Sequence, residues 1–298
     1  MSSLIACVSQ TPKSTVNQDY CIEVENKIIP FKGIIVADGI GSHARSELSS
    51  KFCSDRLKLK LESIERKEDI DFNLLFSDIK NDLIEFIENE LSDYELKNNP
   101  VGTTLICSIE LEDEYKIAYV GNGSIWQLSG AFNSFSSNRY LPWNSINLLN
   151  PHTIEQEGRS ALYKFFSIGE SSSIPSIITL SKNQDIYSDI IIITTDGIFT
   201  NDQMKIGKDE NDVIWIMGEE TMRLLYEKLD IFFKDHPNSA TSNDLKVMLN
   251  DYLTELKNSK KLDDDATLGI IIQSNVFVYQ KKRIELLNSK RNEANTSK

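Results

Sequence analysis

The segment GIIVADG at residues 33–39 and the segment IIIITTDG at residues 190–197 each end a run of apolar residues with an Asp-Gly pair. Both runs are too short for a helix and apolar enough to be buried on both faces, which predicts two buried strands. The glycine after each acid allows a sharp turn and a close approach of the backbone to a ligand. Two such strands could bring Asp38 and Asp196 together as oxygen ligands of a hard divalent cation. The alternative is two ordinary turns, since Asp-Gly is among the commonest turn dipeptides.

A third acidic group precedes a third apolar run. Asp263, Asp264 and Asp265 stand directly before the segment ATLGIII at residues 266–272. Because adjacent carboxylates repel one another, three of them at the start of a strand indicate either a cation site or a solvated loop.

The composition is that of a globular protein. The chain has 298 residues, 40% hydrophobic and 26% charged, enough for one large domain or two small ones. A formal net charge of -13 argues against nucleic acid as a partner, because phosphate backbones are held by clustered Lys and Arg. The N-terminus lacks a basic segment followed by an apolar core, and no apolar run has the length of a membrane span. We therefore expect a cytoplasmic protein with no membrane partner.

The four cysteines, Cys7, Cys21, Cys53 and Cys107, are widely spaced. Because they form no Cys-x-x-Cys pair, neither a zinc site nor a dense disulfide framework is indicated. Reduced thiols are the expectation.

Periodicity predicts the coarse organisation. Helices are expected at residues 44–64, 74–97 and about 242–257, each with apolar residues on one side. The segments 103–111, 115–120 and 125–128 are typical of a β-meander, with a type I′ turn at Asn122-Gly123. These elements fit an α+β architecture of packed sheets covered by helices. A doubly wound α/β sheet stays open as an alternative, because buried Ile-rich strands ending in Asp occur there too.

Six short motifs follow one another over residues 5 to 273: Asn17-Gln18-Asp19, Val36-Ala37-Asp38-Gly39-Ile40-Gly41-Ser42-His43, Gly102-Thr103-Thr104, Ala118-Tyr119-Val120-Gly121-Asn122-Gly123-Ser124, Thr194-Thr195-Asp196-Gly197 and Asp264-Asp265-Ala266-Thr267. In this order they resemble the motifs of the metal-dependent protein Ser/Thr phosphatases of type 2C, the PPM family, and particularly its bacterial members. Six motifs in the right order are far more specific than any one of them.

The resemblance implies a four-layer α-β-β-α sandwich, in which two antiparallel sheets are flanked by helices. It places a phosphatase domain at residues 1–275, with a variable flap at about 130–185 beside the site. Residues 276–298 would form a C-terminal extension, and its last ten or so residues are expected to fray because they show little periodicity.

The resemblance also implies a bimetallic site that hydrolyses phosphoserine and phosphothreonine in proteins through a water bridging two ions. Asp38 would bridge the ions, the Gly39 carbonyl would bind one, Asp196 and Asp264 would bind the other, and Asp19 would be a ligand or lie just behind the ligands. Mn2+ or Mg2+ is expected, because these ligands are all oxygens. The catalytic residues would then be Asp38, Asp196 and Asp264, acting through metal-bound water.

Several positions depart from the family pattern. Ser14 stands where the family has a phosphate-binding Arg, and the adjacent Lys13 is the substrate-binding residue we expect instead, although Lys does not reproduce a forked Arg contact. Gln18 replaces a Glu and Asn122 replaces an Asp, and no acid precedes His152. A third metal site is therefore expected to be absent or weak.

Two functions from different classes follow. The first is a protein Ser/Thr phosphatase that acts on a phosphorylated protein and reverses a cognate Ser/Thr kinase in signalling. The second is a catalytically weak relative that binds and regulates a phosphoprotein or kinase partner. A small phosphorylated metabolite as substrate also stays open, because fold and site chemistry do not fix the substrate. His43 matches a family position, but local packing at a helix start explains it equally well, and no catalytic role is assigned to it.

Overall fold

The computed structural model describes residues 3–12, 16–41, 43, 45–90, 101–133, 143–156, 159–169, 171–198, 205–208, 214–217 and 220–296. Lys13 and Ser14 lie outside the described residues.

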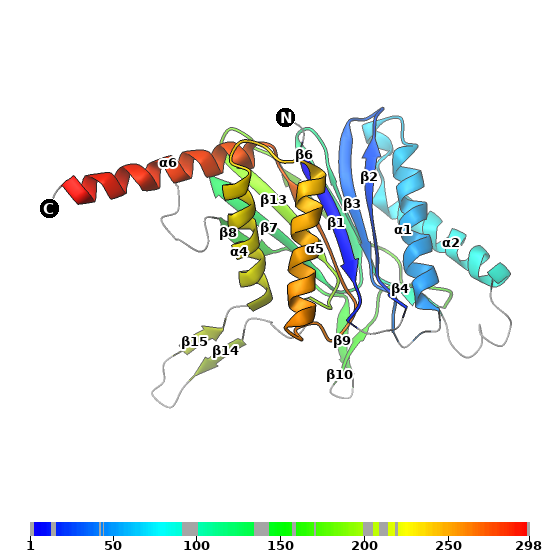
Figure 1. Ribbon diagram of the computed structural model, residues 1–298. Helices are drawn as coiled ribbons and strands as arrows, with labels where there is room; N and C mark the ends of the chain where they lie inside the picture. The colour runs from blue at the N-terminus through cyan, green and yellow to red at the C-terminus, as the bar shows by residue number, and fades with distance from the viewer. Residues whose placement is uncertain are drawn as a thin grey trace.

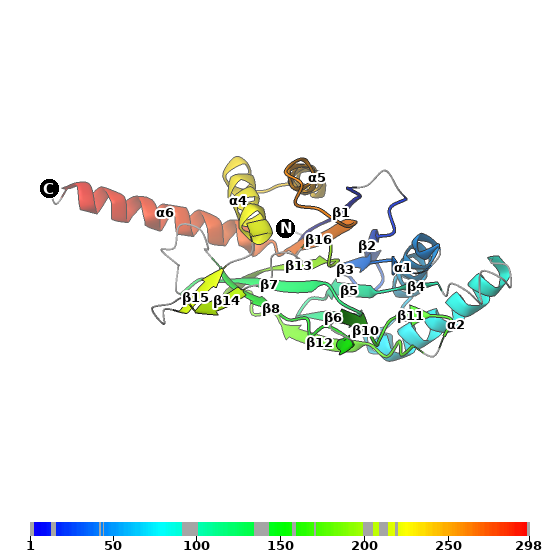
Figure 2. The same ribbon diagram turned by 90° about the horizontal axis from the view of Figure 1, so that it is seen from below.

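Two five-stranded antiparallel sheets form the centre of the molecule (Figures 1 and 2). The first sheet has the order β1 (Leu4–Gln10), β16 (Ala266–Ile272), β13 (Tyr187–Thr194), β7 (Ser124–Ala131) and β8 (Asn144–Asn147). The second sheet has the order β12 (Ser176–Ser181), β6 (Glu114–Val120), β5 (Leu105–Glu110), β3 (Phe31–Ala37) and β2 (Tyr20–Asn26). Neighbouring strands come from distant parts of the chain, so the register of each sheet depends on long-range pairing.

Helices cover the outer face of each sheet (Figure 2). The second sheet is covered by α1 (Ser46–Glu62) and α2 (Phe72–Glu90), and the first by α4 (Glu220–Asp235) and α5 (Ser242–Asn258). A short 3-10 helix, η1 (Lys67–Asp69), joins α1 to α2. The expected four-layer sandwich is confirmed, and the doubly wound sheet is wrong because every pair within the two sheets is antiparallel.

Side chains of the central strands alternate between two cores. Ile191 and Ile193 of β13 lie in the core between the sheets, whereas Ile190 and Ile192 lie in the core under α4 and α5. In β3, Ile34 and Val36 face the other sheet, and Ile35 and Ala37 face α1 and α2. Successive side chains of a strand point to opposite faces, and both faces are covered. This double burial explains why these strands read as uninterrupted apolar runs.

The expected β-meander is wrong at its third strand. β6 pairs with β5 in the second sheet, but β7 pairs with β13 and β8 in the first. The type I′ turn is also wrong, because it requires positive φ at both central residues, and here Gly121 (φ 111°) and Gly123 (φ 113°) have positive φ while Asn122 does not. The two glycines let the chain cross from one sheet to the other and leave Asn122 at the crossing point.

The remaining strands are short. In the range expected as a flap, β8 and β12 belong to the main sheets, β9 (Thr153–Gln156) pairs with β10 (Arg159–Leu162), and β11 (Phe166–Ser167) pairs with β4 (Gly102–Thr103). A further hairpin consists of β14 (Lys205–Lys208) and β15 (Ile214–Met217). The role of residues 130–185 as a flap stays a prediction.

The chain continues past the first sheet as α6 (Asn275–Thr296), which runs outward beyond α4 (Figure 1). The backbone is thus helical where the sequence showed little periodicity, and the domain boundary near residue 275 stays a prediction. None of the helices among the described residues combines the length and apolar character needed to cross a bilayer.

Candidate functional site

Four predicted site residues come from strand ends at one end of the sandwich. Asp19 directly precedes β2 and Asp38 directly follows β3, and these strand ends pair as Tyr20 with Ala37. In the first sheet, Thr194 at the end of β13 pairs with Leu268 of β16, so Asp196 and Asp264 lie beyond neighbouring strand ends. This is the end toward which the β1 arrow points in Figure 1. Antiparallel pairing therefore brings together acids that are far apart in sequence.

Hydrogen bonds join the two sheets at this end, and two of them hold carboxylates. The Thr195 hydroxyl Oγ1 donates to Asp19 Oδ2 at 2.7 Å. The Gln18 backbone N–H donates to Asp265 Oδ2, also at 2.7 Å. Thr195 is fixed in turn by β16, because its N–H donates to the Thr267 carbonyl at 3.0 Å. Each sheet thus holds one carboxylate of the other in place.

Backbone contacts fix Asp38 and Gly39. The Asp38 carbonyl accepts from the Thr104 N–H at 2.8 Å and from Thr103 Oγ1 at 2.9 Å, and the Asp38 N–H donates to Thr104 Oγ1 at 3.1 Å. The Gly39 N–H donates to the Gln18 carbonyl at 3.1 Å. A Cβ on Gly39 would lie 2.7 Å from that carbonyl oxygen, closer than real Cβ atoms come to any neighbour, so only glycine fits. These bonds aim the Asp38 side chain while leaving its carboxylate for the site.

Asp196 receives a side-chain donor from the crossing between β6 and β7. Asn122 Nδ2 donates to Asp196 Oδ2 at 2.5 Å. Gly197 lets the turn after Asp196 pass close to the strand start, because a Cβ there would overlap the Asp265 carbonyl oxygen. The position of Asp196 therefore depends on both Asn122 and Gly197.

The carboxylates disfavour one another's charge. The pKa of Asp38 is raised, first by burial and then by the charges of Asp19 and Asp196. Burial is also the largest cause that raises the pKa of Asp19 to about 7. The pKa of Asp196 is raised by burial and by the charge of Asp264, whereas its bonds to Asp38 and Asn122 lower it. Burial and the neighbouring carboxylates therefore both oppose full ionisation of Asp19, Asp38 and Asp196.

The donor set fits a hard divalent cation. All the side-chain atoms predicted to bind metal are carboxylate oxygens, which hard divalent cations prefer. One of them, Asp19 Oδ1, is buried without a hydrogen-bond partner. Within the described residues, no three or more His, Cys, Asp or Glu side chains form a cage that could hold a metal ion. Such a cage is not required for Mg2+, which is usually bound through one or two carboxylates and keeps several waters. Asp38 interacts with both Asp19 and Asp196, so paired carboxylates are present at this end of the sandwich.

The sequence-predicted residues thus divide into two groups. Asp19, Asp38, Gly39, Asp196 and Asp264 lie at the same end of the sandwich, with Asp264 exposed at its edge. Lys13 lies outside the described residues, so its substrate-binding role stays a prediction. The sequence interpretation missed how Thr195 and Asp265 support the site, although both stand beside predicted ligands.

The family model of protein phosphatase 2C matches residues 8–229, which is most of the chain and includes Asp19, Asp38 and Asp196. The chain belongs to the protein phosphatase 2C family. Among curated proteins, no sequence matches it.

Solved structures of protein phosphatases share the fold. A bacterial serine phosphatase matches with a TM-score of 0.62 and 18% identity, covering 90% of this chain and 97% of the other. A serine/threonine phosphatase from Staphylococcus aureus matches with a TM-score of 0.61 and 19% identity over 90% and 94% of the two chains. The serine/threonine phosphatase of S. agalactiae gives 0.61 and 17% over 91% and 99%. At these identities the likeness shows the fold alone.

His43 of this protein phosphatase 2C chain packs locally. Its ring centre lies 5.9 Å from that of Phe165, and its backbone N–H donates to the Ile40 carbonyl at 2.8 Å. Burial lowers its pKa, and its Nδ1 is buried without a hydrogen-bond partner. Local packing accounts for its position.

His152 supports the site from behind, a role that the sequence did not reveal. The ring atom Nδ1 accepts from the backbone N–H of Gly121 at 3.1 Å, and the backbone N–H of His152 donates to the Gly121 carbonyl at 3.0 Å. The proton of the neutral ring must then lie on Nε2, which donates to Ser176 Oγ at 2.9 Å. The buried ring stacks on Tyr119 at 5.0 Å. His152 therefore fixes the residue directly before Asn122.

We expect His152 to make stability fall as the pH falls from about 6.5 to about 4. Burial lowers its pKa from 6.5 to about 4, with the charge of Lys164 as a smaller cause. The unfolded chain takes up the proton first, so unfolding becomes easier by at most about 3 kcal/mol across that window. The raised pKa of Asp19 makes stability change with pH in the opposite direction. The measurement is therefore the difference in unfolding free energy between wild type and His152→Gln, from urea unfolding at several pH values with EDTA present. A parallel pH dependence in the two proteins would contradict the prediction.

Proposed function

We propose that this protein phosphatase 2C chain hydrolyses phosphoserine and phosphothreonine esters in proteins with the help of two divalent ions, Mn2+ or Mg2+. The observation that carries the proposal is the meeting of Asp19, Asp38 and Asp196 at one end of the sandwich, where burial raises the pKa of all three and the charges of Asp19 and Asp196 raise that of Asp38 further. Carboxylates with raised pKa values gathered in one place are more often functional than structural.

In this proposal Asp38 would help to hold both ions, since it interacts with both Asp19 and Asp196. The Gly39 carbonyl would bind one ion, Asp196 and Asp264 would bind the other, and Asp19 would complete the set. When bound, the ions supply an activated water and neutralise the phosphate oxygens. Thr195 holds Asp19, and Asn122 holds Asp196, so that the carboxylates keep their places when the charges change.

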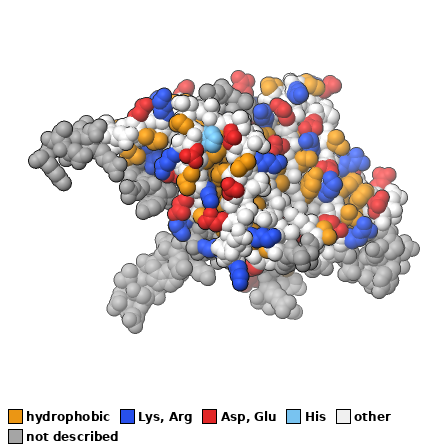
Figure 3. Space-filling view, in the orientation of Figure 1, with side chains coloured by type: hydrophobic (Ala, Val, Ile, Leu, Met, Phe, Trp, Pro, Cys, Tyr) orange, Lys and Arg blue, Asp and Glu red, His pale blue; other side chains and the backbone are white. Residues whose placement is uncertain are grey.

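A phosphorylated protein is the substrate that fits the family, and a cognate Ser/Thr kinase is the partner whose action it would reverse. On the face shown in Figure 3, acidic and basic side chains of the described residues are intermixed. Together with the net charge of -13, this distribution argues against a nucleic acid as the partner. We also propose a cytoplasmic location.

Asn122 favours a second candidate function, that of a catalytically weak module that regulates a phosphoprotein or kinase. Its amide already occupies Asp196 Oδ2, and it brings no charge of its own. Loss of the family's phosphate-binding Arg, replaced by Ser14, would cost about 2 to 4 kcal/mol of transition-state stabilisation, which slows the enzyme without abolishing activity. We also expect the third metal site to be absent or weak.

The test is phosphate release by the wild-type protein from phosphoserine and phosphothreonine peptides with Mn2+, with Mg2+ and with EDTA. We expect release with either ion, none in EDTA, and recovery when excess Mn2+ is added back. Free phosphoserine separates a protein phosphatase from an enzyme for small metabolites, and we expect the peptides to react faster. Binding of the phosphopeptides without turnover would favour the regulatory module instead.

A further inference from the structure

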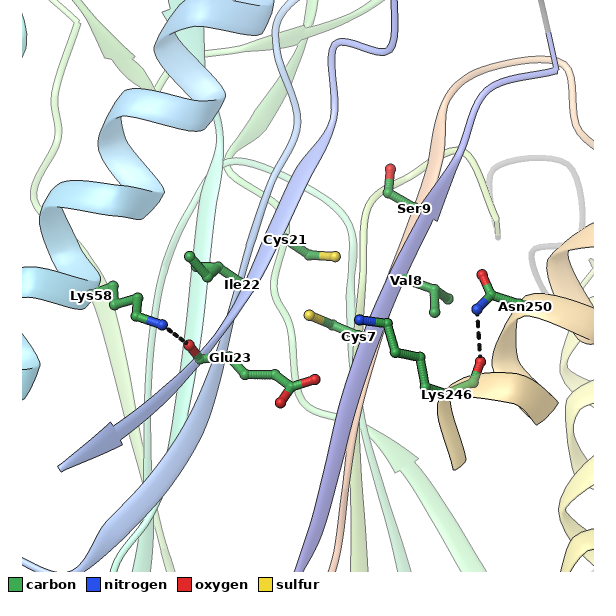
Figure 4. Close-up of a pocket in the computed structure, with 9 residues that line it drawn as sticks. All are labelled: Cys7, Val8, Ser9, Cys21, Ile22, Glu23, Lys58, Lys246 and Asn250. Atoms are coloured by element: carbon green, nitrogen blue, oxygen red, sulfur yellow. Dashed lines mark hydrogen bonds between the residues drawn. The ribbon is translucent and has the colours of Figure 1, made fainter. Parts of the chain in front are cut away.

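Cys7 and Cys21 face each other across the open edge of the sandwich. Cys7 lies on β1 and Cys21 on β2, which are edge strands of the first and second sheet, respectively. Both residues line a cavity of about 480 Å³, together with Glu23, Lys58, Lys246 and Asn250. In Figure 4 the two sulfur atoms point toward one another from the two strands. Both thiols therefore border one cavity, with Cys7 buried and Cys21 half-buried.

The two thiols lie close enough to affect each other's ionisation. The neighbouring Cys7 thiol is the largest cause that raises the pKa of Cys21, with burial second. The other two cysteines differ, because Cys53 and Cys107 are fully buried in the core under α1 and α2. Of the four, Cys7 and Cys21 are the pair that shares a cavity.

We propose that Cys7 and Cys21 form a reversible disulfide when the protein meets a low-molecular-weight disulfide such as oxidised glutathione. One cysteine attacks the oxidant as its thiolate, forms a mixed disulfide and releases one glutathione thiolate. The second cysteine then attacks the mixed disulfide and releases the other. The two protein thiols lose two electrons and two protons, and the oxidant disulfide is reduced to two thiols.

The cavity can admit this oxidant. Its volume of about 480 Å³ lies within the range of roughly 300 to 1,000 Å³ typical of small-molecule pockets. Lys246 is exposed on α5 and lines the cavity, and its positive charge attracts the carboxylates of glutathione. Lys58 is engaged elsewhere, since its Nζ donates to the Glu23 carbonyl at 2.8 Å.

Formation of the disulfide would displace the acidic cluster, that is Asp19, Asp38 and Asp196. This consequence rests on the proposed function. Cys21 is two residues beyond Asp19, and Cys7 is two residues before Ser9, whose Oγ accepts from Thr267 Oγ1 at 2.6 Å and from Asn17 Nδ2 at 2.7 Å. An S–S bond of about 2.05 Å is shorter than any thiol hydrogen bond, so its closure draws β1 and β2 together. Because a displacement of 1 Å can cost about a hundredfold in rate, we expect oxidation to slow phosphate release at least about tenfold.

The experiment treats the full-length protein with oxidised glutathione and maps its disulfides by mass spectrometry before and after reduction. We expect the wild type to lose two hydrogen atoms and to yield one cross-linked peptide pair containing Cys7 and Cys21. Cys7→Ser should not form this bond, and Cys107→Ser should form it like wild type, with folding checked by circular dichroism. Absence of the cross-link in folded wild type, or a glutathione adduct alone, would overturn the proposal.

Phosphate release is measured on the same samples. We expect the oxidised wild type to be slowed, the reductant to restore it, and Cys7→Ser to be insensitive to the oxidant. If the disulfide forms and phosphate release is unchanged, the proposed effect of the disulfide on the site is wrong. Inactivity of the reduced protein would count against the proposed function alone, because the disulfide map does not depend on turnover.

Discussion

Asp38→Asn is expected to lower metal-dependent phosphate release on the order of a hundredfold to a thousandfold. Asp38 is the carboxylate that interacts with both Asp19 and Asp196, so its loss would weaken both proposed ion positions at once. The Asn side chain keeps the shape and removes the charge. The measurement is kcat for a phosphothreonine peptide at saturating Mn2+.

The same substitution should stabilise the protein when metal is absent. Burial and the charges of Asp19 and Asp196 raise the pKa of Asp38, so ionising it costs folding free energy at neutral pH. Removing that charge should raise the unfolding free energy by about 1 to 2 kcal/mol in EDTA, as replacing a strained functional residue commonly does. Opposite changes in activity and stability distinguish a functional site from a structural one.

Asp113→Asn is the matched control, because it removes the same charge at the β5–β6 turn, where Asp113 forms an exposed ion pair with Lys67 at 2.8 Å. Activity and stability should both stay close to wild type. Loss of activity in both variants would point to a general effect of charge, and an unchanged Asp38→Asn protein would contradict the assignment of Asp38.

Gly197→Ala should destabilise the fold by about 3 kcal/mol or more and abolish most activity. A Cβ at this position would overlap the Asp265 carbonyl oxygen, which is backbone and cannot turn away like a side chain. Either the turn that carries Asp196 or the start of β16 must move. Urea unfolding and phosphate release on the same preparation measure the two effects.

Gly169→Ala is the control for the loss of a glycine as such. Its Cβ would meet Ser167 Oγ at 3.6 Å, an ordinary contact, and we expect a change within about 1 kcal/mol. Equal destabilisation of the two variants would show that the close approach of Gly197 to Asp265 is unimportant.

The sequence predicted the parts of the fold that depend on local pattern. The apolar runs before Asp38 and Asp196 are buried on both faces, and the helices expected at 44–64, 74–97 and about 242–257 correspond to α1, α2 and α5, with residues 91–97 outside the described residues. The pairing of β7 was mispredicted, because the choice between sheets is made by Gly121 and Gly123 through their positive φ, and Asn122-Gly123 is equally typical of a hairpin. α4 was not predicted at all.

At the site, the resemblance to the family motifs predicted the acidic residues but not the residues that hold them in place by hydrogen bonds. His152 fixes Gly121 through contacts that depend on the three-dimensional path of residues far apart in sequence. The proximity of Cys7 to Cys21 depends on two edge strands of different sheets, so their spacing alone indicated no disulfide. Thr195 could have been noticed, since a hydroxyl next to a predicted ligand often binds a second carboxylate, and here it holds Asp19.

The most direct test of the central claim is a calorimetric titration of the metal-free wild type and Asp38→Asn with Mn2+ near neutral pH. If the acidic cluster is a bimetallic site, the wild type binds two ions per chain and Asp38→Asn loses at least one of them or binds far more weakly. A wild type that binds no Mn2+, or binding that Asp38→Asn leaves unchanged, would contradict the account.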